Sequence, residues 1–169
     1  MSFVNALALV LGVIGGILTY ASLSTGLFMI WATFIFTATG VALGGTAEAF
    51  KNLVLCALMG MVLAVIAALL ILNVNLGLPG ALWPAIVVGA TTACLALVAH
   101  IPLFPAIPAT VIGYASTFAY VLSANLLTPE GITGGGTKNP AFLITTSLVV
   151  AYGFGRVSLA LASKLSAKA

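Results

Sequence analysis

Long apolar stretches, with hardly any charged residue between them, constrain the fold of this sequence more than any other feature. An apolar helix needs about 20 residues to cross the hydrocarbon core of a bilayer, and stretches of about that length recur from end to end. Only 4% of the 169 residues are charged, whereas soluble globular chains carry about 25%. The sequence therefore predicts an all-α membrane protein with about six transmembrane helices, forming a single transmembrane domain over residues 1–169. The predicted spans are 3–23, 27–45, 51–73, 82–100, 107–127 and 139–161.

The basic residues predict how the chain is oriented. Met1–Asn5 contains no Lys or Arg, and the apolar run continues through Tyr20, which is longer than the 7 to about 15 residues of a signal peptide, so we interpret it as a retained span. With six spans, four basic residues lie on one side of the membrane and Lys138 lies on the other. The cytoplasmic side carries the excess of basic residues, so both termini are expected in the cytoplasm. The four residues are Lys51, Arg156, Lys164 and Lys168.

Two halves of the chain resemble each other, over residues 3–73 and 82–161. Lys51-Asn52 precedes the third span, and Lys138-Asn139, 87 residues later, precedes the sixth. Three spans per half would send the halves through the membrane in opposite directions, a 3+3 inverted repeat typical of transport folds. The alternative is that six short spans simply repeat the same hydropathy. Identical residues also recur at an offset of 77, at Val10, Gly12, Leu18, Ile30, Ala32, Thr33, Ile35 and Ala38.

The residues needed for catalysis and metal binding are scarce. The chain has one His, no Asp, and two Glu that both fall in predicted loops, so we expect no catalytic site, no metal site and no cofactor. Cys56 and Cys94 lie in apolar runs without CxxC spacing and are interpreted as small buried side chains. The five basic residues do not cluster, so no nucleic-acid partner is expected. The segment Gly131–Lys138 lacks the residue order of a phosphate-binding loop and is interpreted as a flexible loop.

The segment His100–Pro108 contains a proline at every third position, at Pro102, Pro105 and Pro108. Three prolines forbid a regular helix, and the sequence predicts an extended lead-in to span five. One interpretation is a helix that starts partway into the membrane with its amino-terminal dipole facing a site; the other is an interfacial turn with proline at the first helical position. His100 is either a gating or proton-transfer residue or a side chain at the headgroup level.

Spans two and five carry the polar and aromatic side chains. Thr33 and Thr37 are four residues apart, as are Tyr114 and Phe118, so each helix presents hydroxyls and rings together. Such side chains can line a pathway for a small neutral solute. The alternative is packing, because Ser and Thr also bond to helix carbonyls and aromatic residues anchor at interfaces. The candidate pathway residues are Trp31, Thr33, Phe34, Thr37, His100, Pro105, Pro108, Thr110, Tyr114, Ser116, Thr117 and Phe118.

Small residues at four-residue spacing indicate close helix packing, at Gly12 and Gly16 and again at Gly40 and Gly44. They suit packing within one subunit or between the subunits of a homo-oligomer, which we expect in the lipid bilayer.

The glycine-rich first span and the segment Pro-Ala-Thr-Val-Ile-Gly-Tyr-Ala-Ser-Thr-Phe-Ala at 108–119 carry a family resemblance. The chain resembles the small bacterial integral membrane proteins grouped as DUF1097. This resemblance implies a multi-pass protein of the bacterial inner membrane and brings no activity with it. The functional hypothesis rests instead on the possible inverted halves, the proline-rich lead-in and the hydroxyl and aromatic side chains. It is a channel or facilitator for a small uncharged solute, with the pathway between spans two and five. The alternative hypothesis is a structural or accessory subunit of a larger membrane complex.

Overall fold

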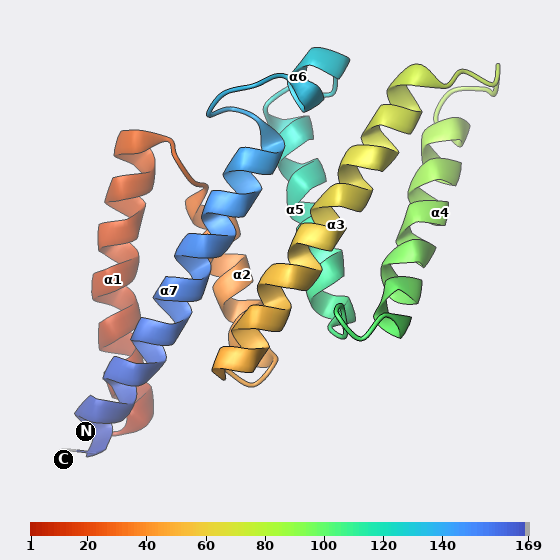
Figure 1. The fold of residues 1–169 in the computed structure, drawn as a ribbon. Coiled ribbons are helices and arrows are strands. Elements are labelled where there is room, and N and C mark those ends of the chain that lie inside the picture. Colours follow the sequence, from red (N-terminus) through yellow and green to blue (C-terminus); the bar gives the residue numbers. More distant parts are fainter. Residues whose placement is uncertain (168–169) are drawn as a thin grey trace.

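Helices occupy all six ranges in which the sequence predicts a span (Figure 1). The structure is a computed structural model that describes residues 1–167, so Lys168 lies outside the described residues. Residues 1–167 contain helices and no strand, which confirms the all-α fold class. The helices are α1 (Phe3–Thr25), α2 (Ile30–Ala42), α3 (Ala47–Asn73), α4 (Leu82–Leu97), a 3₁₀ turn (Val98–His100), α5 (Ile107–Ser123), α6 (Pro129–Thr133) and α7 (Pro140–Ala167).

Four of these segments are long and apolar enough to cross a membrane, namely α1, α3, α7 and α4 with the 3₁₀ turn that follows it. The helices α2 and α5 are also apolar but have only 13 and 17 residues. At 1.5 Å per residue they extend about 20 Å and 26 Å, less than the hydrocarbon thickness of about 30 Å. The structure thus has four helices of spanning length where the sequence predicted six, and α2 and α5 are the two short ones.

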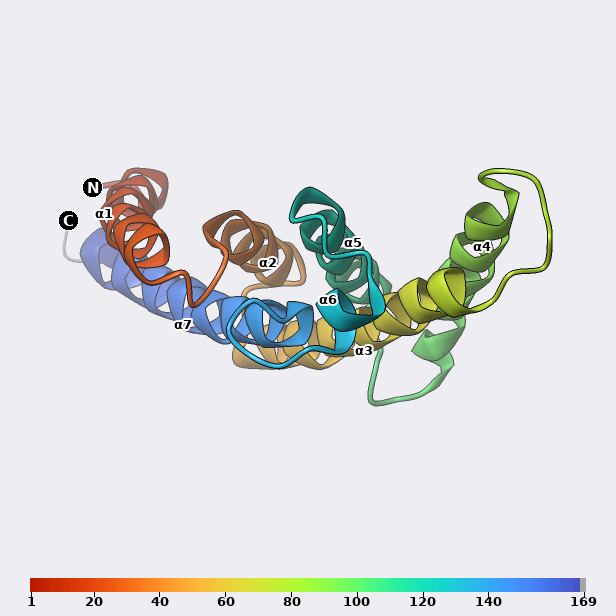
Figure 2. The ribbon, with the colours of Figure 1, turned by 90° about the horizontal axis from the view of Figure 1, so that it is seen from above.

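The apolar helices form two layers (Figure 2). Helices α1, α2, α5 and α4 stand in a row, and α7 and α3 cover one side of that row. Helix α7 packs on α1 and α2, whereas α3 packs on α5 and α4, and α3 and α7 also touch each other. The most extensive contact of all joins α3 to α5. Figure 1 shows that α1 and α4 run in opposite directions, as do α2 and α5, and α3 and α7.

Local sequence explains where several helices begin and end. Gly26, with φ of 65°, ends α1, and its N–H donates to the Ser22 carbonyl. The Thr46 hydroxyl accepts from the Ala49 N–H and caps α3, so α3 begins at Ala47 inside the stretch predicted as a loop. Thr128 caps α6 in the same way. The loop predicted to be flexible between spans five and six therefore contains a helical turn.

Glycines allow the central helices to approach closely. A Cβ added at Gly60 of α3 would collide with the backbone of α5 at Thr110, and one added at Gly113 of α5 would collide with the backbone of α3 at Ala57. The fully buried ring of Phe50 lies against the glycine at position 40 in α2 and the one at position 155 in α7. Glycine is thus the residue that lets α3 contact α5, and also lets Phe50 join α2 to α7.

Candidate functional site

The chain leading into α2 is non-helical, and side chains of two other helices hold its backbone. The Met29 N–H donates to the Ser147 hydroxyl at 2.9 Å. The hydroxyls of Ser22 and Thr146 donate to the carbonyls of residues 28 and 27, at 2.8 Å and 2.6 Å. Non-helical backbone at membrane depth is tolerated where protein satisfies its polar groups. These three hydroxyls explain why α2 begins at Ile30, three residues later than the predicted span.

The chain leading into α5 is also non-helical, as its prolines predict. Helix α5 begins at Ile107 with Pro108 as its second residue, and the Ala106 N–H donates to the thiol sulfur of Cys56 at 3.4 Å. Cys56 lies nine residues after the first residue of α3, about 14 Å along the helix axis. The start of α5 therefore lies beside the body of α3, two to three turns away from the end of that helix.

The two lead-ins correspond in position. Met29 and Ala106, the residues that immediately precede α2 and α5, are 77 residues apart. Both are buried, and each donates its backbone N–H to a side chain of a long helix from the other half of the chain. The sequence did not predict Ser147 or Cys56 as an acceptor. The prediction that both cysteines are buried is confirmed for Cys56 and wrong for Cys94, which is exposed. The polar run 145–147 inside an apolar span was the one signal that pointed to Ser147.

Two threonine hydroxyls of α2 face α7. Thr33 donates to its own helix at the Met29 carbonyl (3.0 Å) and lies 3.5 Å from the Ser147 carbonyl oxygen. Thr37 donates to the Ala151 carbonyl at 3.3 Å. Both side chains lie on one buried face of α2, as their spacing predicts. They contribute to the α2–α7 contact.

Three hydroxyls of α5 bond to α4 or to α5 itself. Thr110 donates to the Ile107 carbonyl at 2.7 Å and lies 3.3 Å from the Leu95 carbonyl oxygen. The Tyr114 hydroxyl pairs with that of Thr91 in α4 at 2.8 Å, and the hydroxyl at position 117 donates to the carbonyl four residues earlier. The structure therefore does not bring the hydroxyls of α2 and α5 together at one surface.

The remaining candidate side chains lie at several places. Trp31 and Phe34 are 39% and 43% exposed on α2, and the Phe34 ring meets Phe154 edge-on with centroids 5.7 Å apart. Phe118 packs against Tyr114 with ring centroids 5.0 Å apart. Ser116 is buried in α5, and His100 is exposed at the end of the 3₁₀ turn.

Pro105 and Pro108 line a cavity of about 280 Å³ at one end of the α2–α5 pair, which we call the Pro105 cavity. It lies between the end of α2, the beginning of α3 and the lead-in to α5. Leu43, which follows α2, forms part of its wall, and Asn52 of α3 contributes a polar side chain. The amino-terminal end of α5, which is the positive end of its helix dipole, lies at this cavity.

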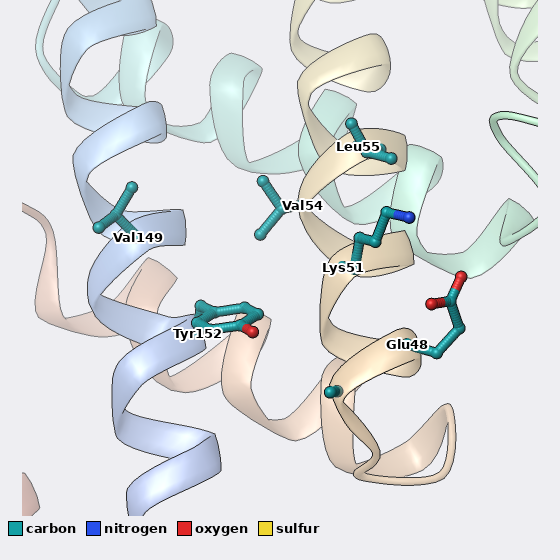
Figure 3. A pocket seen from close by; sticks show the side chains of 7 residues that line it. Glu48, Lys51, Val54, Leu55, Val149 and Tyr152 are labelled. Carbon is teal, nitrogen blue, oxygen red and sulfur yellow. The ribbon is translucent and has the colours of Figure 1, made fainter.

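Two further hollows lie beside α7. A groove of about 460 Å³ runs between α3 and α7, with Glu48, Lys51 and Tyr152 as its polar residues and aliphatic side chains along the rest (Figure 3). A cavity of about 380 Å³ lies between α1, α2 and α7, and Phe34 and Thr37 are among its lining residues. Within residues 1–167, no three His, Cys, Asp or Glu side chains gather as metal ligands would.

Comparison with known proteins identifies a family for almost the whole length of the chain. A family model described as "Protein of unknown function (DUF1097)" matches residues 8–163. No curated protein and no solved structure matches the chain.

Proposed function

The chain belongs to the DUF1097 family, whose description gives no function. From the arrangement of the helices we propose that the protein is a channel or facilitator for a small uncharged solute. It is a multi-pass protein of the bacterial inner membrane, it has no enzymatic activity, and its pathway runs between α2 and α5.

One observation carries this proposal, namely that α2 and α5 are the two apolar helices that fall short of spanning length, when the 3₁₀ turn is counted with α4. They stand next to each other in the middle of the row in Figure 2, and non-helical backbone precedes each of them. In transport proteins, short or interrupted helices at corresponding places in two repeated halves mark the solute site. Together with their lead-in segments, α2 and α5 complete six passages through the membrane.

The packing of the helices supports two inverted halves. Thr33 of α2 lies against Ser147 of α7, and Thr110 of α5 lies against Gly60 of α3. The offset of 77 relates Thr33 to Thr110, and the offset of 87 relates Gly60 to Ser147. Hence the contact that joins α2 to α7 has its counterpart between α5 and α3. The opposite directions of the paired helices in Figure 1 fit a two-fold axis in the membrane plane.

The chemistry around the two helices favours a neutral solute. In the described residues, the one polar side chain that lines the Pro105 cavity is that of Asn52, which offers an amide carbonyl and an NH₂ group, and no charged side chain lines it. These groups exchange hydrogen bonds with a neutral solute but do not compensate for the hydration that an ion would lose. A solute that carries a carbonyl or hydroxyl oxygen also suits the amino-terminal end of α5.

The charged residues support the proposed orientation. Arg156 donates to the carbonyl of Gly45 in the α2–α3 loop at 3.1 Å, Lys51 lies in the first turns of α3, and Lys164 lies in the last turn of α7. These residues share the end of the molecule that holds the beginning of α1 and the end of α7 (Figure 1). The positive-inside rule places that end in the cytoplasm.

Open glycines on the outermost helices support a homo-oligomer. Nothing lies within 4 Å of a Cβ added at Gly12 or Gly16 of α1, or at Gly89 of α4. Gly12 and Gly89 are related by the offset of 77. Both ends of the helix row therefore present small residues to which a helix of a second subunit can pack closely.

Solute flux into proteoliposomes tests the proposed function. The purified protein is reconstituted, and light scattering follows swelling after an osmotic step with urea, glycerol or a potassium salt. We expect the neutral solutes, and not the salt, to enter faster than into empty liposomes. Asn52→Phe fills the Pro105 cavity and should return the flux to the level of empty liposomes. Leu55→Phe adds an aromatic ring to the same helix at the groove of Figure 3 and should leave the flux unchanged.

A second function, that of an accessory subunit in a larger membrane complex, is favoured by the hydroxyl bonds. Thr33, Thr37 and Thr117 donate to helix carbonyls, as residues that serve only packing do. Gentle purification from native membranes separates the two functions. A self-contained homo-oligomer with neutral-solute flux supports the channel, whereas a stable complex with other proteins and no flux from the isolated protein supports the accessory subunit.

A further inference from the structure

The cavity between α1, α2 and α7 contains a buried hydroxyl without a partner. Ser158 of α7 is 1% exposed, and its Oγ has no hydrogen-bond partner in the part of the chain that the structure describes. It lines the cavity of about 380 Å³ together with Phe34 and Thr37 of α2 and Leu7 of α1. A buried polar atom without a partner is rare and costly, so this hydroxyl indicates what the cavity accommodates.

Three other hydroxyls of α7 contrast with that of Ser158. Thr146, Ser147 and Ser163 each donate to the carbonyl four residues earlier in the same helix, at 3.0 Å, 2.6 Å and 2.9 Å. This bond is the usual way in which a hydroxyl is satisfied within an apolar helix. Ser158 makes no such bond, and it is one of the residues that line the cavity.

A second hydroxyl in the cavity retains some bonding capacity. Thr37 donates its proton to the Ala151 carbonyl at 3.3 Å, which leaves the lone pairs of its oxygen free to accept a hydrogen bond. The rest of the wall comes from apolar or aromatic side chains such as Leu11 and Phe154. A lipid chain would fill the apolar part but would leave Ser158 without a partner. A charged ligand would find no counter-charge there.

We propose that this cavity is a binding site for a small neutral molecule with an apolar body and one hydroxyl or carbonyl group, which pairs with Ser158. An apolar cavity of about 150 Å³ holds one benzene molecule, so the larger volume here accepts a substituted aromatic ring or a short branched chain. The site lies on the α1 side of α2, away from α5, and its existence does not depend on the proposed solute flux.

The test compares two probes of equal shape, benzyl alcohol and ethylbenzene, which differ by one hydroxyl in place of a methyl group. The full-length protein is placed in lipid nanodiscs with its leucine methyl groups labelled with ¹³C, and methyl NMR follows the titration. We expect saturable shifts at Leu7 and Leu11 with both probes. Loss of one neutral hydrogen bond corresponds to about a 5- to 10-fold change in affinity. Ser158→Ala should therefore weaken benzyl alcohol binding by that factor and leave ethylbenzene within about 2-fold.

Two further variants complete the experiment. Ser163→Ala removes a hydroxyl of α7 that is bonded to its own helix and does not line this cavity, so it should change neither affinity. Ala38→Leu fills the cavity from α2 and should abolish the shifts for both probes. The proposal is overturned if the leucine shifts do not saturate, if Ser158→Ala weakens both probes alike, or if it weakens neither.

Discussion

The contact between α3 and α5 gives the sharpest prediction for stability. Gly60→Ala introduces one methyl group where α3 lies against the backbone of α5. The atoms that the methyl group meets are the Thr110 carbonyl and the Tyr114 N–H. These belong to the helix backbone, so no rotamer change can move them aside. The two helices must separate or shift along each other.

The magnitude follows from the geometry. Two non-bonded carbon atoms are best separated by about 3.5 Å. A methyl carbon added at residue 60 would lie much closer than that to the α5 backbone. The helices must therefore move apart by about 1 Å or more along the most extensive contact in the fold. Overpacking typically costs about 1 to 3 kcal/mol. Because both partners in this contact are helix backbone, we expect the upper end of that range, which is about a hundredfold change in the folding equilibrium.

Reversible unfolding in mixed micelles measures this cost, and Gly12→Ala is the matched control. Nothing lies within 4 Å of the added methyl group at Gly12, and replacing glycine by alanine within a helix is favourable by up to about 1 kcal/mol. We expect Gly60→Ala to unfold at a much lower denaturant fraction than the wild type, and Gly12→Ala to unfold at the same fraction or a higher one. Equal stability of the two variants would refute the close α3–α5 contact.

Three further variants probe individual contacts. Ser147→Ala leaves the buried Met29 N–H without its acceptor, so a loss of about 1 to 3 kcal/mol in the same unfolding assay is expected, and an unchanged midpoint would contradict the role given to Ser147. Phe50→Ala empties a fully buried position and should cost about 3 to 5 kcal/mol; a cost below about 1 kcal/mol would show that the ring is not packed. Tyr114→Phe removes a bond to Thr91, whose hydroxyl still bonds to its own helix, so thermal denaturation should register less than about 1.5 kcal/mol, and global unfolding would contradict this.

The sequence was sufficient to place the helices because hydropathy is a local property. It did not predict where α2 begins, since the backbone just before Ile30 is bonded to Ser147, 118 residues away from Met29. The beginning of α3 was also predicted four residues too late. The signal there was local, because Thr46 is a typical N-cap residue and its hydroxyl accepts from the Ala49 N–H.

The candidate site was predicted only in part. Spacing correctly placed Thr33 and Thr37 on one face of α2, but periodicity does not tell which helix that face meets, and it meets α7. The prolines correctly predicted an interrupted lead-in to α5, because Pro102 and Pro105 lack the N–H groups that a helix would need there, whereas Pro108 is accommodated in the first turn of α5. Ser158 was not singled out, since a serine that bonds its own helix and one that borders a cavity have the same sequence pattern.

Reversible blocking of the Pro105 cavity tests the proposed pathway most directly. In a background with Cys56→Ser and Cys94→Ala, Asn52→Cys places one thiol in the wall of the cavity, and benzyl methanethiosulfonate attaches a bulky neutral group to it. The proposed pathway predicts that neutral-solute flux falls to the level of empty liposomes on labelling and returns when a reducing agent removes the label. Complete labelling with unchanged flux would contradict a pathway through this end of α2 and α5.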